Sequence, residues 1–473
     1  MANQVWTAVT FIAFMLLFTV VGIYSATRKQ NTTSDYLLAS RNVNPWLTAL
    51  SAQASGQSGF LFIGEVGFAY QAGISALWLT IGWAIGDYIA WWLVFKRLRQ
   101  ISELTASETV SSLLGQETKG FRPITKVSAL IIITLMGTYA AAQLVAGSKA
   151  LNAVFGWNYN LGIIVGAVIV VIYCFSGGIR ASIWTDAAQS VVMIGSLLLL
   201  LVVAVAGSGG VVQIWRKLGE IDPALVSLSP QNLQLGLLPF FIGWIAAGFG
   251  VVGQPHILVR GMAIDSADSI ACARNIKIIC GLMASFCAIG VGLTARVMLP
   301  ELMSNGDPEL ALPYLSLELL PAILVGLMLA GLFAATISTA DSQILSSSAA
   351  LTQDLFPQIA QSYKWAKLGT LTVTMIILSM ALAGDDNVFA LVIFAWSALA
   401  SGLGPLLLVR VWQKPVTAPV AIAMMVAGIG AALTWKLGLN LSGIVYEVLP
   451  GMTAGMGVYL VAQIFTRQKQ IIK

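Results

Sequence analysis

The chain has 473 residues, of which 58% are hydrophobic and only 10% are charged, and its mean hydropathy is +0.86. Because soluble proteins carry a charge on about a quarter of their residues, this composition excludes a soluble fold and indicates an integral membrane protein. The formal net charge of +5 is small and dispersed along the chain, which argues against a nucleic-acid-binding protein.

Thirteen apolar segments are long enough to cross a bilayer, since a spanning helix needs about 20 apolar residues. In chain order they cover residues 6–26, 45–65, 72–95, 127–148, 158–177, 184–208, 236–254, 275–299, 315–348, 368–384, 388–410, 417–437 and 442–465. These spans would use most of the chain and leave short loops. We therefore expect no fused kinase, ATP-binding domain or large extramembrane enzyme.

The basic residues predict the orientation of these spans. When the N-terminus is placed outside, twenty Lys and Arg residues lie in inside segments and five lie outside. The positive-inside rule therefore favours an N-out, C-in, multi-pass protein, which is the arrangement that thirteen spans require.

The chain has four cysteines and one histidine. Cys174, Cys272, Cys280 and Cys287 lie in or beside apolar segments, so we interpret them as small buried hydrophobic residues. The set offers too few ligands for a Cys/His metal site.

Two of the predicted spans contain residues that favour a break in the helix. The second carries the small and polar run Ala54 to Gly59, and the seventh carries several glycines between Gly243 and Gly253. Broken helices are tolerated in a bilayer where the backbone lines a cavity, and breaks at matching positions five spans apart are typical of an inverted-repeat transporter. The alternative is close helix packing through small residues.

The halves share no convincing sequence identity, so the repeat rests on topology alone. The expected organisation is a first helix and cytoplasmic loop over 1–44, one repeat over 45–208, an extracellular loop over 209–235, a second repeat over 236–410, and two final helices with a short cytoplasmic tail over 411–473.

Four acidic residues fall at bilayer depth, where ionisable groups are costly and usually functional. We expect Glu65, near the outer end of its span, to reach water, and Asp87 to pair with a nearby Arg or Lys in a structural role. Asp186 and Asp341 are the stronger functional candidates.

The ninth span carries a polar stripe. Ala335, Ser338, Asp341 or Ser342, and Ser346 share one helical face, with Thr339 beside Ser338. Sodium is a hard cation that prefers oxygen ligands; two hydroxyls, the Ala335 carbonyl and carbonyls freed by the break at 54–57 could supply them. The alternative is that the hydroxyls bond back to carbonyls of their own helix.

At these residues the sequence resembles the sodium/solute symporter family, and within it the bacterial sodium/proline branch. The motifs that carry the resemblance occur in order along most of the chain: Thr33–Leu38 with Arg41; Thr48–Ala52, Ala54–Ser55 and Ser58–Gly59; Ser176–Gly178, Trp184–Asp186 and Gln189; Gly253–Leu258 with Arg260 and Met262; Ser338–Thr339, Ser348–Thr352 and Asp354–Leu355; Ala395–Trp396 and Gly404–Pro405.

The resemblance implies an all-α membrane fold of two inverted five-helix repeats whose first helices are discontinuous, in the plasma membrane (the bacterial inner membrane). It implies sodium-driven import of a small polar solute, such as proline, by alternating access. The implied sodium ligands are the carbonyls of Ala54, Gln57 and Ala335 and the hydroxyls of Ser338 and Thr339. A second ion or proton site would use Asp186, Asp341 and Ser342.

For the solute we select six residues by expected depth and chemistry, beside the break in the second span: Gln57, Ser58, Trp78, Trp244, Phe249 and Trp396. The expected partners are the solute, sodium ions and membrane lipid. We expect no organic cofactor and no nucleic acid, and a protein that works as a monomer.

Three positions depart from the proline branch. Gly56 stands where that branch has an Asp, and Ala247 and Val251 stand where close proline transporters carry a Trp and a Tyr. These changes lie where we expect the protein to recognise its solute. The solute could therefore differ from proline and be pantothenate, urea or a short carboxylate. The extra carboxylate of Asp341 keeps proton coupling open as well.

Other functional classes fit less well. A channel would need a continuous polar pore, and a membrane enzyme would need catalytic groups that one histidine and scattered cysteines do not supply. A transporter-like sensor would need a signalling domain, whereas only residues 466–473 follow the last segment.

Overall fold

The computed structural model describes residues 2–27, 32–115, 122–230, 233, 235–304, 306–359, 363–384 and 387–471, and most of these residues are helical. Within this part β-pairing is limited to one isolated bridge, between Val43 and Ile264. The expected all-α class is therefore confirmed.

The helices, in chain order, are α1 (Ala2–Ala26), α2 (Thr33–Leu38), α3 (Pro45–Gly59), α4 (Val66–Ala72), α5 (Leu77–Ala90), α6 (Lys96–Leu104), α7 (Val110–Gly115), α8 (Pro123–Phe155), α9 (Tyr159–Gly207), α10 (Val211–Ile221), α11 (Leu237–Phe249), α12 (Pro255–Ala263), α13 (Ile270–Met298), α14 (Ala311–Leu319), α15 (Ala322–Ala349), α16 (Tyr363–Ala383), α17 (Val388–Val411), α18 (Ala418–Leu433) and α19 (Val448–Ile471). Short π-helical segments continue α3, α5, α15 and α18, at Phe60–Glu65, Trp91–Phe95, Ala350–Leu355 and Thr434–Gly438.

Nine helical stretches of the described residues are long and apolar enough to span a membrane, or ten if the bent pair α11–α12 counts as one. Two predicted spans, the second and third, merge into one stretch over Pro45–Leu104, and two more fall on the shorter apolar helices Tyr159–Ile172 and Lys367–Ala383. Each predicted span thus has a helical counterpart, while the count of thirteen and the orientation stay predictions.

The predicted start of the ninth span was wrong. Residues 315–319 belong to the separate short helix α14, and α15 begins only at Ala322. The residue before a proline is pushed toward extended backbone, and Leu320, which precedes Pro321, is extended with φ −106° and ψ 144°. Apolar composition runs through this break, so hydropathy could not locate it.

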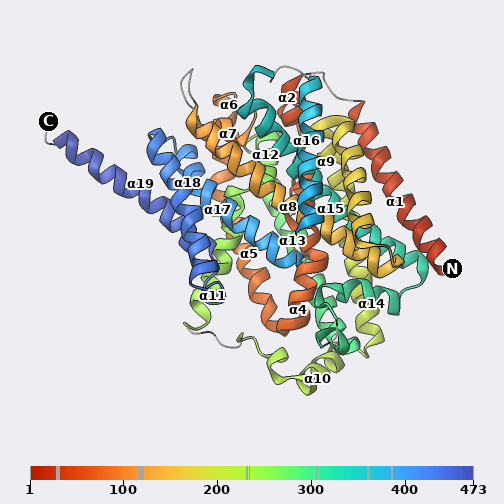
Figure 1. Cartoon of the computed structure of the whole chain (residues 1–473). Helices are drawn as coiled ribbons and strands as arrows, with labels where there is room; N and C mark the ends of the chain where they lie inside the picture. Colours follow the sequence, from red (N-terminus) through yellow and green to blue (C-terminus); the bar gives the residue numbers. More distant parts are fainter. Residues whose placement is uncertain are drawn as a thin grey trace.

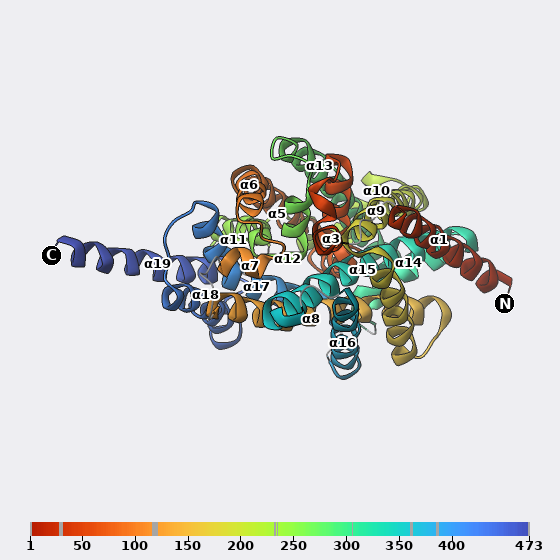
Figure 2. The ribbon, with the colours of Figure 1, turned by 90° about the horizontal axis from the view of Figure 1, so that it is seen from above.

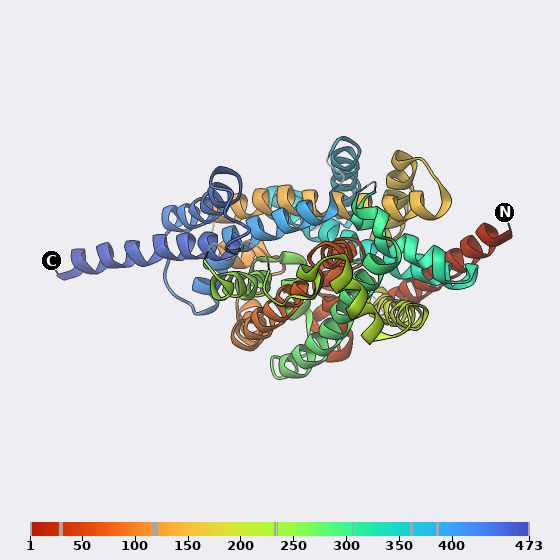
Figure 3. The same ribbon diagram turned by 90° about the horizontal axis from the view of Figure 1, so that it is seen from below.

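The bundle is elongated, with α1 and α19 at its opposite flanks (Figures 1 and 2). The view from above places α3 and α15 near the middle, and the view from below shows the same arrangement of the two termini (Figures 2 and 3). In Figure 1, α10 and α14 lie at the lower end of the bundle, and α2, α6 and α7 lie at the upper end. The segment predicted to be extracellular, which contains α10, is thus separated from the segments predicted to be cytoplasmic.

The first predicted break lies within α3. Ser58 adopts φ 57° and ψ −173°, which interrupts the helix. The backbone groups next to it find side-chain partners, as a low-dielectric environment requires: the Gly59 N–H donates to Gln143 Oε1 at 2.7 Å, and the Phe60 N–H donates to Ser58 Oγ at 3.1 Å. Side chains from this helix and from α8 therefore stabilise the break.

The second predicted break separates α11 from α12, whose directions differ by 61°. Glycines of this segment also serve close packing, the alternative interpretation. A Cβ atom on Gly248 would lie 1.9 Å from the Trp83 carbonyl oxygen of α5, and one on Gly86 of α5 would lie 1.9 Å from the Ile245 carbonyl oxygen. Both interpretations therefore hold for the seventh span.

The cysteines only partly match the expectation. Cys287 is buried and Cys280 is half-buried, but Cys272, near the start of α13, is exposed. The interpretation of Cys272 as a buried residue was wrong, because it faces away from the bundle on the first turn of its helix. Cys174 lies outside the residues whose burial the structure describes, as do the motif residues Ser176 and Gly177.

Candidate sodium and solute sites

The hydroxyl of Thr339 on α15 meets the backbone at the broken helix α3. Its Oγ1 lies 3.2 Å from the Ser55 carbonyl oxygen and 3.5 Å from that of Ala54, and it donates to the Ala335 carbonyl at 3.0 Å. Ser338 Oγ lies 3.1 Å from the same Ala335 oxygen. The structure thus brings together four of the five predicted sodium ligands, Ala54, Ala335, Ser338 and Thr339, as a cluster of oxygen atoms.

The fifth predicted ligand, Gln57, lies one turn further along α3. Its carbonyl oxygen accepts the Phe60 N–H. Its side-chain amide Nε2 points to α13, 3.4 Å from Ser285 Oγ and 3.5 Å from the Gly281 carbonyl oxygen. Gln57 therefore links the break in α3 to a cavity beside α13.

The alternative interpretation of the polar stripe holds in part. Thr339 bonds back to Ala335, and Ser342 Oγ donates to the Ser338 carbonyl at 2.6 Å. Thr339 nevertheless also reaches across to α3, which a hydroxyl satisfied only within its own helix would not do.

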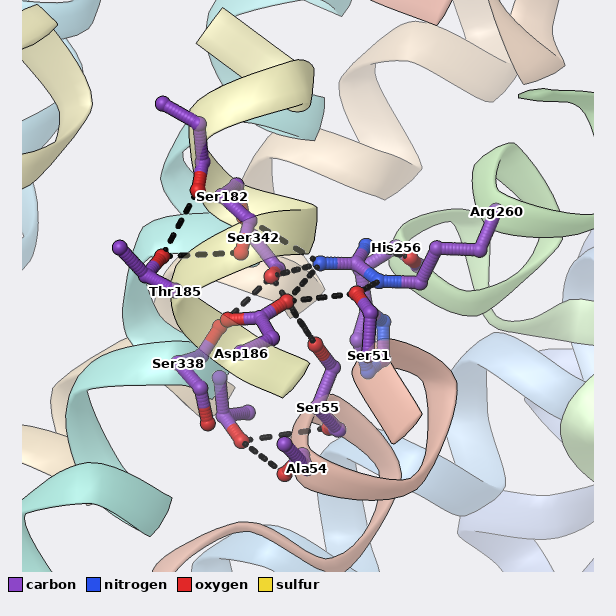
Figure 4. A network of polar contacts seen from close by, with 12 residues as sticks. Ser51, Ala54, Ser55, Ser182, Thr185, Asp186, His256, Arg260, Ser338 and Ser342 are labelled. Carbon is purple, nitrogen blue, oxygen red and sulfur yellow. Dashed lines mark hydrogen bonds and ion pairs between the residues drawn. The ribbon is translucent and has the colours of Figure 1, made fainter. Parts of the chain in front are cut away.

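Asp186 of α9 lies at the centre of a buried polar network (Figure 4). Its Oδ2 atom accepts hydrogen bonds from Ser51 at 2.7 Å and from Ser55 at 3.2 Å, and it pairs with Arg260 Nη2 of α12 at 2.8 Å. Ser55 also contacts Ser342 Oγ of α15 at 3.1 Å. Four helices thus supply groups to one network.

Arg260 compensates the charge of Asp186. Its guanidinium also bonds to Ser51 Oγ at 2.8 Å, to Ser342 Oγ and to the His256 carbonyl. A buried carboxylate without a partner is strongly unfavourable, so a cation near Asp186 could have been expected. From the sequence, Arg260 was assigned only to the family motif and to the basic residues of the inside segments. Its role as the cation that compensates Asp186 was missed.

Asp341 faces a different environment from its neighbour Ser342. It lines a small cavity together with Thr19 and Gly22 of α1 and Ser182 and Thr185 of α9. Of the three residues predicted for a second ion or proton site, Asp186 and Ser342 are therefore in one network, and Asp341 lies beside it, next to Ser182.

A cavity lies next to the break in α3, between α3, α5, α13 and α17. Two of the six predicted solute residues line it, Gln57 and Trp396, and so do two of the departure positions, Gly56 and Val251. The third departure position, Ala247, supplies the carbonyl that accepts Trp396 Nε1–H at 2.8 Å.

The other four predicted solute residues are packed elsewhere. Ser58 is buried at the break, Trp78 donates from Nε1 to the Leu228 carbonyl at 2.7 Å, and Trp244 stacks on Tyr446 with ring centroids 5.1 Å apart. Phe249 is a partly buried member of the hydrophobic core. Depth along a helix was predicted for these residues, but not the direction of their side chains.

Charged side chains that sequence reasoning undervalued line the same cavity. Glu65, expected to reach water, is 2% exposed, so that expectation was wrong; it accepts hydrogen bonds from Thr80 at 2.7 Å and Ser285 at 3.1 Å. The expected pairing of Asp87 is confirmed, because Lys277 of α13 forms an ion pair with it.

Comparisons with known proteins show the family of the chain. The sodium:solute symporter family model matches residues 36–428. A sodium/proline symporter of Staphylococcus aureus is 31% identical over 489 residues, covering 98% of this chain and 94% of the relative, and sodium/proline symporter 2 of Staphylococcus saprophyticus is 30% identical, covering 96% and 93%.

Two solved structures share the fold at 18% sequence identity. A sodium-coupled sialic acid symporter in a substrate-bound, outward-open state superimposes with a TM-score of 0.79, covering 96% of both chains. A nucleobase-cation-symport-1 family transporter in a closed conformation gives a TM-score of 0.59, covering 93% of this chain and 96% of that one. At this identity the likeness shows the fold alone.

Proposed function

Because the chain belongs to the sodium:solute symporter family, we propose that it imports a small polar solute, an amino acid such as proline, in symport with sodium by alternating access. It is a multi-pass protein of the plasma membrane and a transporter rather than an enzyme. The membrane potential would aid entry by about 2.3 kcal/mol per charge per 100 mV.

The observation that carries this proposal is the contact of Thr339 with the broken helix α3. We place the sodium ion among the carbonyls of Ala54, Gln57 and Ala335 and the hydroxyls of Ser338 and Thr339. An ion held there would join α15 to the break in α3, because ligands from both helices must approach it together. Hard oxygen donors suit this ion.

The solute would bind in the adjacent cavity, against Gln57 and Trp396. Gln57 belongs to both sites in this arrangement, with its carbonyl toward the ion and its amide toward the solute. Binding of either ligand would therefore favour binding of the other, because both would have a higher affinity for the conformation in which Gln57 is positioned between the two sites.

A second ion or proton at Asp186, Asp341 and Ser342 would have to compete with Arg260, which already neutralises Asp186. We therefore propose sodium coupling at the Thr339 site alone, with proton coupling through Asp341 as the alternative. We further propose that the protein works as a monomer and without an organic cofactor.

The experiment that tests the coupling ion uses the purified protein in sealed proteoliposomes, with sodium and proton gradients imposed separately. Uptake of labelled amino acids should require the sodium gradient and persist when the proton gradient is collapsed. Uptake driven by a proton gradient in the absence of sodium would contradict the proposal. Asp341→Asn supplies the internal check, because it should leave sodium-driven uptake intact.

A further inference from the structure

The cavity next to Gln57 carries charges at its two ends. On α5, Thr80 and Asp87 are seven residues apart on one face, and on α13, Lys277 and Ser285 are eight apart on one face. At a rise of 1.5 Å per residue, the two ends are separated by about 11 Å. At one end, the hydroxyls of Thr80 and Ser285 donate hydrogen bonds to the Glu65 carboxylate. At the other end, Lys277 forms an ion pair with Asp87.

The two ends differ in charge. The Asp87 carboxylate is neutralised by the Lys277 ammonium, whereas within the described part of the chain Glu65 is bound by the neutral hydroxyls of Thr80 and Ser285 and by no basic side chain. With all three groups ionised, the lining carries one net negative charge, and it is located at Glu65. A carboxylate at this depth favours a cationic partner, and the cavity provides space for one.

Two further polar side-chain atoms of residues that line the cavity have no hydrogen-bond partner among the residues that the structure describes. One is Gln53 Nε2, a donor on a side chain that is 3% exposed, and the other is Asp87 Oδ1, an acceptor on a side chain that is 5% exposed. Buried polar atoms are nearly always satisfied in proteins. A ligand that carries both a hydrogen-bond acceptor and a donor would satisfy these two atoms.

We propose that this cavity selects solutes that carry a protonated amine, which the Glu65 carboxylate binds, together with an oxygen acceptor for the amide groups of Gln53 and Gln57. The inference rests on the proposed import function and narrows its solute class. It favours amino acids and other amine-bearing solutes over urea, and over pantothenate and short carboxylates, which carry an anionic group but no ammonium group that Glu65 could bind.

The proposal is tested first on the unmodified protein, in proteoliposomes with an inward sodium gradient. A panel of proline, other amino acids, a simple monoamine, urea, pantothenate and lactate is offered for uptake and for competition. Only the amine-bearing compounds should accumulate or compete. Sodium-driven accumulation of lactate, pantothenate or urea would overturn this inference while leaving sodium symport intact; a lack of sodium dependence for every solute would overturn the proposed function itself.

The role of Glu65 is then tested with Glu65→Gln, which keeps the shape and an acceptor for Thr80 but removes the charge. The KM for the amine-bearing solute should rise by about tenfold or more, since hydrogen bonds to charged groups are the stronger ones. The sodium concentration that half-maximally raises the melting temperature should be unchanged, which shows that the variant folds and binds sodium.

Two variants control this comparison. Glu318→Gln makes the same change on the exposed face of α14 and should leave the KM unchanged. Glu65→Asp keeps the charge and should retain part of the affinity. A Glu65→Gln protein with unaltered KM, or a Glu65→Asp protein that is impaired as much as Glu65→Gln, would overturn the assignment of Glu65 as the amine-binding group.

Discussion

The guanidinium of Arg260 and the carboxylate of Asp186 form an ion pair, 2.8 Å between Nη2 and Oδ2, in which both side chains are almost fully inaccessible to solvent. The pair joins α12, the helix after the second break, to α9, and through Ser51 and Ser55 it reaches α3, the helix of the first break. The two broken helices are thus connected by one buried charge network next to the candidate sodium site.

Removing the cation of this pair should destabilise the protein strongly. Breaking a buried ion pair by replacing one partner costs about 3–5 kcal/mol, because the other charge remains buried and unpaired. We expect Arg260→Gln to lower the melting temperature markedly in detergent, and sodium to restore part of that loss by taking the vacated position next to Asp186.

The control for this prediction is Arg216→Gln, whose side chain is 64% exposed on α10 and which should be neutral. The double variant Asp186→Asn, Arg260→Gln should recover much of the lost stability, since it leaves no unpaired charge. If Arg260→Gln were as stable as the parent protein, Arg260 would not be the group that compensates Asp186.

A second ion-pair cluster fixes the start of α17. Lys149 of α8 contacts Asp307 at 2.6 Å and Glu309 at 2.7 Å, and the Glu309 carboxylate accepts the N–H groups of Val388 and Phe389 at 3.2 and 2.8 Å. A carboxylate at a helix N-terminus satisfies free N–H groups and interacts favourably with the helix dipole.

We therefore expect Glu309→Ala to lower the free energy of unfolding by about 1–3 kcal/mol. Thermal unfolding followed by tryptophan fluorescence measures the change, with Glu318→Ala on α14 as the exposed control. Equal melting temperatures for the two variants would contradict a role for Glu309 in holding α17.

The close approach of α5 and α11 depends on glycine. A Cβ atom on Gly86 would lie 1.9 Å from the Ile245 carbonyl oxygen and 2.5 Å from the Phe249 amide nitrogen. Gly86→Ala should therefore push the helices apart and reduce transport and melting temperature together. Gly195→Ala on α9 is the matched control, because in the described part of the chain no atom outside the adjoining residues and local backbone of α9 lies within 4 Å of the added group; it should be tolerated, since alanine is the better helix former.

Much of the fold could be predicted from the sequence because apolar length and helix-breaking residues are local signals. The helical spans, the break near Ser58 and the break before Pro255 all follow from such signals. Part of the candidate sodium cluster was accessible for a similar reason: Ala335 and Ser338 are three residues apart and share one helical face, and Thr339 follows Ser338 directly. The complete ligand set was implied by the family resemblance.

The charge partners could not be predicted in the same way. Arg260 lies 74 residues from Asp186, and Lys277 lies 190 residues from Asp87, so each pair is created by the packing of distant helices. Both basic residues lie near the ends of predicted spans and were assigned to the inside segments. The side-chain directions of Trp78, Trp244 and Trp396 could not be predicted either. An apolar span indicates how deep a residue lies in the membrane, but gives little information on which face of the helix points into the bundle.

The most direct test of sodium binding between α3 and α15 is the sodium concentration that supports half-maximal uptake in proteoliposomes, measured for the parent protein and for the double variant Ser338→Ala, Thr339→Ala. Thr372→Ala is the control, because it removes a hydroxyl at an exposed position on α16 that donates to the Leu368 carbonyl of the same helix. The double variant should require at least about tenfold more sodium, since it loses two oxygen ligands, while the control should match the parent. An unchanged sodium requirement in the double variant would contradict the site at Ala54, Ala335, Ser338 and Thr339.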